Sequence, residues 1–341
     1  MTNSEPGSKT IPRISLTAPV FILSSLVTLI SLSIASSSQK LPTAKNESDE
    51  YTLHVNTNLV ILNATVLNHD KALVSGLAKE NFQVYENQVL QSIKHFSHED
   101  IPVSVGLLID NSGSMASKRD DVIAAALNFA ASSNPLDQIF VVNFNEHISY
   151  GLPEGILFTD QREQLQQALF AIHTIGETAL YDAIASALNH LKQSKSDKKV
   201  LIVISDGGDN ASKHSLTQVL EMAKISNAII YTIGIFDEQD GDQNPGVLKR
   251  FAKETGGEAF FPDSSKEIAS ICEGIARDIR NQYTLSYVPM IPISGEGYRT
   301  VEVKVRAPNC GRLSVRTRAG YSVPRAFSTQ AGSPASLDAH E

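Results

Sequence analysis

The hydrophobic pattern changes character twice along the chain. From residue 51 to residue 98, apolar and β-branched positions come in short runs between turn signals, as in "LVILNATVLN" and "NFQVYENQVLQSIKHFS". These runs predict about four strands, too few to bury a core without a partner. Strand patterns return after Asn281 in "YTLSYVPM", "YRTVEVKVRA" and "RLSVRTRAGYSV". We therefore expect the two β segments to pack on each other as a small β-sandwich.

The region between the two β segments alternates between strands and helices. The continuous apolar runs "VSVGLLID", "QIFVVNFN", "KVLIVISD" and "AIIYTIGI" are typical of strands buried on both faces of a parallel sheet. Val122, Ala126 and Ala130 share one helical face, and "HISYGLP" is expected to add an edge hairpin and "EAFF" a short strand. Further helices are expected at 161–173, 179–194, 215–226, 246–255 and 265–281. The predicted fold class is α/β, a doubly wound and mostly parallel sheet inserted between the N- and C-terminal β segments.

The chain ends differ in composition from the rest. Lys9 and Arg13 precede an uncharged, largely apolar stretch at 14–39, as in an export signal. A cleaved signal peptide and a retained membrane anchor both fit this length, and both stay open. We expect an exported protein of the periplasm or cell surface. The predicted order is an export segment at 1–40, a linker at 41–50, a β segment at 51–99, the α/β domain at 100–281, a second β segment at 282–324 and a flexible tail at 325–341.

Composition narrows the function classes. The net charge of -8 and the lack of a Lys/Arg cluster argue against a nucleic-acid partner. Cys272 and Cys310 stand in no CxxC or Cys/His cluster, so thiolate metal binding is not expected, and a disulfide between them is left open. None of the nine histidines is paired with a Ser or Cys in a recognisable catalytic motif. Neither the G-x-S-x-G motif nor a Walker-type phosphate loop occurs.

The candidate chemistry begins in "LLIDNSGSMAS", where Asp110, Ser112 and Ser114 alternate at the end of a predicted buried strand. Thr178 directly precedes a predicted helix, and Asp206 ends another buried strand. Ligands of open α/β sheets bind at the carboxyl ends of the strands, so these loops are expected to meet. Two carboxylates and three hydroxyls form an all-oxygen set that suits Mg²⁺; Mn²⁺ would be accepted too, while Ca²⁺ prefers more oxygens.

Simpler roles exist for several of these residues. Ser112 or Ser114 could instead cap the helix that begins near Met115, which is the commonest task of such a residue. Asp209 and Asn210 are expected to be turn residues rather than ligands. Glu177, beside Thr178, is expected to be a solvated loop carboxylate.

The order Asp110-Asn-Ser112-Gly-Ser114, then Thr178, then Asp206-Gly-Gly, within residues 102–281, resembles the metal-ion-dependent adhesion site of von Willebrand factor type A domains, which also occur in integrins. "GETALYDAI" and "ISDGGDNAS" are characteristic of that family. The flanks are similar to related exported bacterial proteins, prominent in Acidobacteria, which extends the likeness over residues 51–324. The resemblance implies direct metal ligation by Ser112 and Ser114, mainly water-mediated ligation by Asp110 and Asp206, and direct or water-mediated ligation by Thr178. In that family a shift of the last helix is linked to the change at the metal, and a movement of residues 265–281 stays an open question.

The expected function is a non-enzymatic binding or adhesion module of the cell envelope. A Mg²⁺ ion with a free coordination position would recognise a protein ligand through an exposed Asp or Glu carboxylate. One alternative is a metal-dependent phosphoester hydrolase, which needs a general base beside the ion. Another is a scaffold whose metal only stiffens the loops. The ligand's identity and the oligomeric state are left open.

Overall fold

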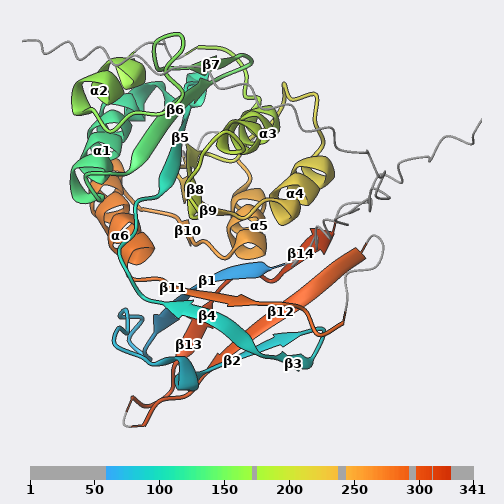
Figure 1. Cartoon of the computed structure of the whole chain (residues 1–341). Coiled ribbons are helices and arrows are strands. Elements are labelled where there is room, and N and C mark those ends of the chain that lie inside the picture. Colours follow the sequence, from blue (N-terminus) through green and yellow to red (C-terminus); the bar gives the residue numbers. More distant parts are fainter. Residues whose placement is uncertain (1–58, 171–174, 237–242, 292–296, 309, 324–341) are drawn as a thin grey trace, which may run out of the picture. The chain divides into compact units, whose positions relative to one another are not determined.

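The computed structural model describes residues 59–170, 175–236, 243–291, 297–308 and 310–323 (Figure 1). The predicted export segment, linker and tail lie outside these ranges, so their predictions stay as they are. Within the described ranges, no helix combines the length and apolar character needed to cross a membrane.

The centre of the α/β region is a six-stranded sheet with the order β10-β9-β8-β5-β6-β7. Its strands are β5 (Ser104–Asp110), β6 (Gln138–Phe144), β7 (Ile148–Tyr150), β8 (Lys199–Ser205), β9 (Ala228–Gly234) and β10 (Ala259–Phe260). All neighbours pair in parallel except β6 and β7, which pair antiparallel. The expected doubly wound, mostly parallel sheet with an edge hairpin is confirmed.

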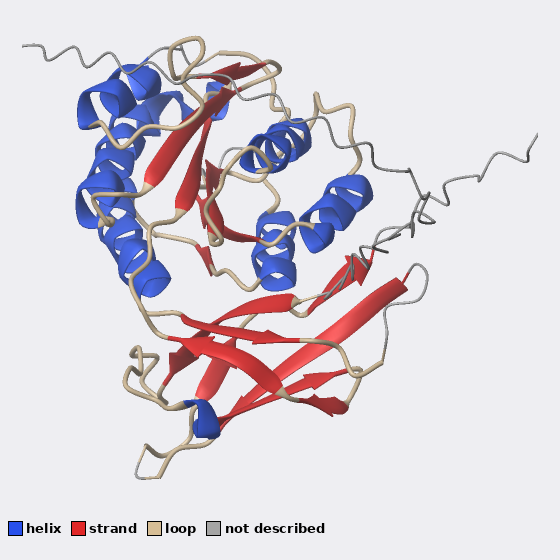
Figure 2. Ribbon diagram, viewed as in Figure 1, coloured by secondary structure: helices blue, strands red, loops and turns tan. Residues whose placement is uncertain are grey.

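Helices cover both faces of this sheet (Figure 2). They are α1 (Arg119–Ser132), α2 (Arg162–Phe170), α3 (Leu180–Leu191), α4 (Leu216–Ile225), α5 (Pro245–Thr255) and α6 (Ile268–Arg280). Leu107 and Ile109 of β5 belong to one core with α1, α2 and α6, whereas Leu108 belongs to a second core with α3, α4 and α5. Successive strand residues point to opposite faces, so a strand buried on both faces must be apolar throughout.

Local signals explain where helices begin and end. Asn244 caps α5 by accepting a hydrogen bond from the Val247 amide at 3.2 Å, Pro245 occupies its first turn, and Gly256 ends it with a φ of 85°. Ser215 and Gln218 form a capping box at the start of α4. The last predicted helix begins as a 3₁₀ turn, Ser265–Glu267, before α6. The predicted end of the helix at 161–173 lies outside the described residues.

The two β segments form two four-stranded sheets, ordered β13-β1-β11-β4 and β14-β12-β2-β3. The strands are β1 (Val60–Leu67), β2 (Phe82–Glu86), β3 (Val89–Gln91), β4 (Ile93–Ser97), β11 (Tyr283–Tyr287), β12 (Gly297–Val305), β13 (Ser314–Arg316) and β14 (Gly320–Val323). β1 pairs with β11 and β2 with β12, and residues of both sheets share one core. Each β segment thus covers apolar side chains that the other segment could not bury alone. The expected β-sandwich is confirmed.

The strand pattern "RLSVRTRAGYSV" forms two strands. It divides into β13 and β14, which belong to different sheets, a division that the pattern did not indicate. Between them, the Thr317 hydroxyl donates to the Asn63 carbonyl at 2.8 Å. A side chain at Gly320 would lie 2.2 Å from the Arg299 carbonyl oxygen, so glycine is needed where the chain joins the second sheet. The crossing depends on contacts between residues far apart in the sequence, and periodicity does not report those.

A buried polar cluster, which we call the polar junction, joins the sandwich to the α/β region. Asp278 of α6 accepts hydrogen bonds from the Thr65 hydroxyl of β1 and the Tyr231 hydroxyl of β9, both at 2.7 Å. Arg316 of β13 forms an ion pair with the same carboxylate. The end of α6 is therefore hydrogen-bonded both to the sandwich, through β1, and to the central sheet, through β9.

Candidate metal centre

Backbone hydrogen bonds gather the three candidate loops at the carboxyl ends of β5 and β8. The Ile175 amide donates to the Asn111 carbonyl at 3.0 Å, and the Gly113 amide donates to the Gly176 carbonyl at 3.2 Å. The Asn210 amide in turn donates to the Thr178 carbonyl at 3.0 Å. The loop before α3 is thus held between the loops that follow β5 and β8.

These loops surround one pocket of about 280 Å³, which we call the strand-end pocket. It is lined by Ser112, Gly113, Ser114, Gly176, Glu177, Thr178, Asp206, Gly208 and Asn210. Four of the five predicted site residues are among them. The fifth, Asp110, is buried directly behind Ser112 and has 2% of its surface exposed. The structure therefore brings all five predicted residues to one place.

The oxygen atoms lie close together. The hydroxyl oxygens of Ser112 and Ser114 are 3.2 Å apart, and the Ser114 hydroxyl donates to Asp206 Oδ2 at 2.6 Å. Neighbouring ligands of an octahedral Mg²⁺ with bonds of 2.0–2.1 Å are about 3 Å apart. The donor set and its spacing therefore fit a small hard cation. Among the described residues no group of three or more His, Cys, Asp or Glu could hold a metal, and this set differs because hydroxyls make up most of it.

Capping does not explain Ser112. This residue occupies the N-cap position of the 3₁₀ helix Gly113–Lys118, but its side chain makes no capping hydrogen bond. Its carbonyl oxygen accepts from the Met115 amide at 3.1 Å instead. The hydroxyl therefore remains directed toward Ser114, which rules out the simpler role for Ser112.

Asp110 supports the pocket from behind. Its Oδ1 accepts from the Ser112 amide at 2.9 Å, and its Oδ2 accepts from the Ser205 hydroxyl at 2.6 Å. Burial raises the pKa of Asp110 to about 6, although the hydrogen bonds from Ser205 and Ser112 oppose the shift. Sequence reasoning missed Ser205, since only the pairing of β5 with β8 brings its hydroxyl to Asp110.

The turn after β8 needs its first glycine. Asp206 Oδ1 accepts from the Gly208 amide at 2.9 Å, and Gly207 between them has a φ of 82°. A side chain at Gly207 would lie 2.5 Å from the Asn244 carbonyl oxygen. The "DGG" sequence therefore lets Asp206 turn back over the end of β8.

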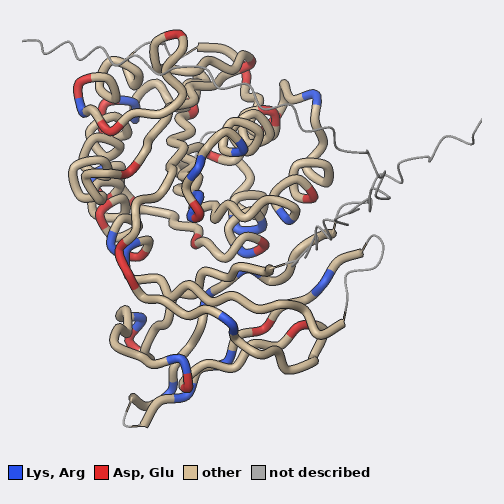
Figure 3. Tube along the Cα trace, viewed as in Figure 1, with Lys and Arg blue, Asp and Glu red and all other residues tan. Residues whose placement is uncertain are grey.

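The rim of the pocket is acidic at Glu177, which is exposed as expected. Its amide donates to Glu146 Oε2 at 2.8 Å, which ties the rim to the turn between β6 and β7. Elsewhere along the described trace, Lys and Arg are interspersed with Asp and Glu (Figure 3).

Cys272 is buried and Cys310 is exposed, and both are free thiols, which settles the open question of a disulfide.

A family model described as the von Willebrand factor type A domain matches residues 104–273. This chain is a von Willebrand factor type A domain protein. The match runs from β5 into α6 and includes all five candidate residues.

The chain is also similar to the following three proteins. An uncharacterized protein of Borreliella burgdorferi is 26% identical over 155 residues, which are 44% of this chain and 44% of that protein. The uncharacterized protein YwmC of Bacillus subtilis is 28% identical over 189 residues, 50% of this chain and 81% of that protein. The chain thus spans less than half the length of the first relative. A solved von Willebrand factor type A structure from Catenulispora acidiphila has a TM-score of 0.49 and 15% identity, with 78% of this chain and 76% of that chain covered.

Proposed function

We propose that the von Willebrand factor type A domain binds one Mg²⁺ in the strand-end pocket and uses it to hold a carboxylate of a protein ligand. Ser112, Ser114 and Thr178 would supply hydroxyl oxygens. Asp206 would face the ion, and Asp110 would orient the loop from behind. Mn²⁺ would occupy the same set, since it accepts the same oxygen donors.

The observation that carries this proposal is the pair of buried carboxylates and their partners. Asp110 and Asp206 are 2% and 3% exposed. The described partners of both acids are backbone amides and serine hydroxyls. Burying carboxylate charge without a cation is costly, so the pocket favours a positive ion.

The charge count explains why an acidic ligand would follow. Asp206 lines the pocket, whereas Asp110 lies behind it, so Asp206 is the nearer charge. A divalent ion among neutral hydroxyls and one near carboxylate keeps a net positive charge. Mg²⁺ also retains exchangeable waters, and a carboxylate from another protein can replace one.

Calorimetric titration of the chain with Mg²⁺ tests the proposal. Ser112→Ala is expected to weaken binding at least tenfold because it removes a direct ligand, as in the roughly 10–100-fold losses seen when metal-site support is removed. Ser117→Ala is the matched control, since Ser117 lies in the same 3₁₀ helix with an exposed side chain. Equal affinity in wild type, Ser112→Ala and Ser117→Ala would reject the site.

The carboxylate ligand can be tested without knowing the partner. With Mg²⁺ bound, acetate is expected to compete with a second carboxylate probe, such as a short glutamate-containing peptide, and EDTA is expected to abolish binding of both. Binding that persists in EDTA would contradict recognition through the ion.

We further propose that the domain acts outside the cytoplasm, on the basis of the export pattern in residues 1–40.

A further inference from the structure

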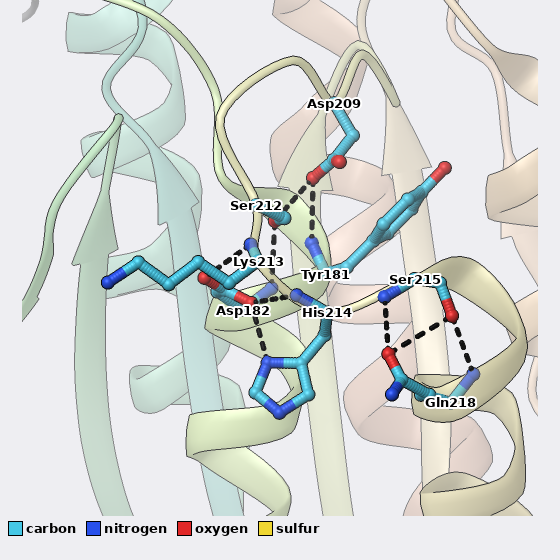
Figure 4. Close-up of polar contacts among 8 residues, drawn as sticks. All are labelled: Tyr181, Asp182, Asp209, Ser212, Lys213, His214, Ser215 and Gln218. Carbon is cyan, nitrogen blue, oxygen red and sulfur yellow. Dashed lines mark hydrogen bonds and ion pairs between the residues drawn. The ribbon is translucent and has the colours of Figure 1, made fainter.

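The loop after β8 and the start of α3 are joined by hydrogen bonds that extend beyond the strand-end pocket (Figure 4). The Asp182 carboxylate accepts from the Lys213 amide at 3.0 Å and from the His214 amide at 2.9 Å. It also accepts from His214 Nδ1 at 2.6 Å. In return, the Asp182 amide donates to the Ser212 hydroxyl oxygen at 3.0 Å.

A second set of bonds lies closer to the pocket. Asp209 Oδ1 accepts from the Tyr181 amide at 3.0 Å and from the Ser212 hydroxyl at 2.6 Å. Asn210 Oδ1 accepts from the Thr178 amide at 2.8 Å, and its own amide donates back to the Thr178 carbonyl at 3.0 Å. We call Asp182, Asp209, Asn210 and Ser212 together the loop clamp. Asp209 and Asn210 were expected only to shape a turn.

The first turn of α3 depends on the loop clamp for its own hydrogen bonds. The first amides of a helix have no partner within the helix and usually bond to the N-cap side chain. Ala179 occupies the N-cap position of α3 and its side chain cannot accept. The amides of Tyr181 and Asp182 instead bond to side chains 28 and 30 residues further along the chain. The position of this helix start is thus set by the loop after β8.

Thr178 stands between the helix start and the pocket. Both of its backbone polar groups bond to the loop after β8, and Asp206 begins that same loop. Asp182, Asp209 and Ser212 do not line the pocket, whereas Thr178 and Asp206 do. These three residues would therefore influence a bound ion through the placement of Thr178 and of the loop after β8, rather than by direct contact.

We infer that the loop clamp is a positioning device, which holds Thr178 at a set distance from Asp206 and so keeps the two walls of the pocket ready for a cation. This inference rests on the proposed function. It assigns roles to Asp182, Asp209, Asn210 and Ser212 that a list of metal ligands would not contain. Supporting residues of this kind typically change metal affinity by roughly 10–100-fold when removed.

The test compares Asp182→Ala and Ser212→Ala with Glu163→Ala in the full chain. Glu163 is an exposed acid in the first turn of α2, so its removal makes the same change in charge at a helix start away from the loop clamp. Titration with Mg²⁺ alone is expected to give a Kd at least tenfold weaker for Asp182→Ala, a smaller loss for Ser212→Ala, and no change for Glu163→Ala. Asp182→Asn is expected to recover part of the loss, because its amide oxygen still accepts from the loop.

Amide hydrogen exchange separates positioning from general loss of stability. Faster exchange is expected at Thr178 and Tyr181 in Asp182→Ala and Ser212→Ala, with unchanged exchange in α1 and α6. If Asp182→Ala does not fold, Ser212→Ala carries the test, because it removes one hydroxyl. Wild-type affinity in folded clamp variants would overturn the inference and leave the proposed function standing. A wild-type chain that binds no Mg²⁺ would overturn both.

Discussion

The strand-end pocket and the polar junction both bury carboxylates, but they balance the charge differently. At the polar junction, Asp278 has the guanidinium of Arg316 beside it as well as the hydroxyls of Thr65 and Tyr231. In the pocket, Asp110 and Asp206 bond to amides and serine hydroxyls. The carboxylate of the junction is paired with a cationic side chain of the protein itself. Under the proposed function, the carboxylates of the pocket would receive their cation from outside.

The sandwich repeats the first arrangement at a separate place. Glu86 of β2 is buried and forms an ion pair with Arg299, and its other oxygen accepts from the hydroxyls of Tyr287 and Tyr321 at 2.7 and 2.8 Å. Two structural acids of this protein are thus each matched with an arginine. Asp110 differs from these two acids, because its described partners are a backbone amide and a serine hydroxyl.

The largest predicted effect is at the polar junction. Asp278→Ala is expected to lower the free energy of unfolding by about 3–5 kcal/mol. It breaks the ion pair with Arg316, whose remaining acidic partner Glu258 is more exposed, and it removes the acceptor of the Thr65 and Tyr231 hydroxyls. Urea denaturation measures this, with Glu273→Ala on the exposed side of α6 as the control. A loss as small as that of the control would show that the junction is not structural, and the comparison would fail.

Asp110 is expected to behave in the opposite way. In EDTA at neutral pH, Asp110→Asn should raise the free energy of unfolding by about 1–3 kcal/mol, since burial raises the pKa of Asp110 from 3.8 to about 6 and each pKa unit corresponds to about 1.4 kcal/mol. The same variant should lose Mg²⁺ binding. Thermal unfolding in EDTA and titration with Mg²⁺ provide the two readings. A variant that is less stable than wild type in EDTA would mean that the carboxylate contributes to the fold.

The smallest predicted effect is on pH dependence. The folded-state pKa of Asp110 lies above its ordinary value, so the folded state favours the protonated carboxyl. The stability that this preference contributes is fully present below about pH 4 and is lost as the pH rises through about 6. Mg²⁺ needs the ionised form, so its affinity should be about tenfold weaker at pH 5 than at pH 7. Calorimetry at the two pH values measures this ratio.

Asp137 offers a matched control for the pH experiment. Burial also raises the pKa of Asp137 to about 6, against hydrogen bonds from the Val103 and Asn134 amides. It lies at the opposite end of β5 from Asp110, next to the start of the strand. Asp137→Asn should therefore alter the pH dependence of stability but leave the pH dependence of Mg²⁺ affinity unchanged. A loss of the latter in this variant would assign the titration to a group outside the pocket.

Periodicity in the sequence was enough to predict most of the fold. Continuous apolar runs predicted β5, β6, β8 and β9, because strands covered on both faces must be apolar at every position. Alternating and short runs predicted the sandwich segments, because neither could bury a core alone. The division of the last segment into β13 and β14 was missed, since both parts have the same strand pattern.

The candidate site was predicted by residue type and position. Hydroxyls and carboxylates at strand ends are visible in the chain, and the rule that strand ends meet at one edge brings Ser112, Thr178 and Asp206 together. The roles of Ser205 and of the loop clamp were not predictable. Ser205 reaches Asp110 from the neighbouring strand, and Asp209 reaches Tyr181 across 28 residues. Such pairs depend on register and packing, which local composition does not encode.

The order of apolar and polar residues alone therefore decided which segments are strands and helices and which oxygens are available at the strand ends, because both follow from short-range periodicity. Folding in three dimensions decided which buried acid received an arginine and which received only hydroxyls and amides. That choice depends on residues far apart in the sequence, such as Asp278 with Arg316 and Asp110 with Ser205. The free energy of a buried charge is determined by its neighbours in space, and only the packed structure supplies them.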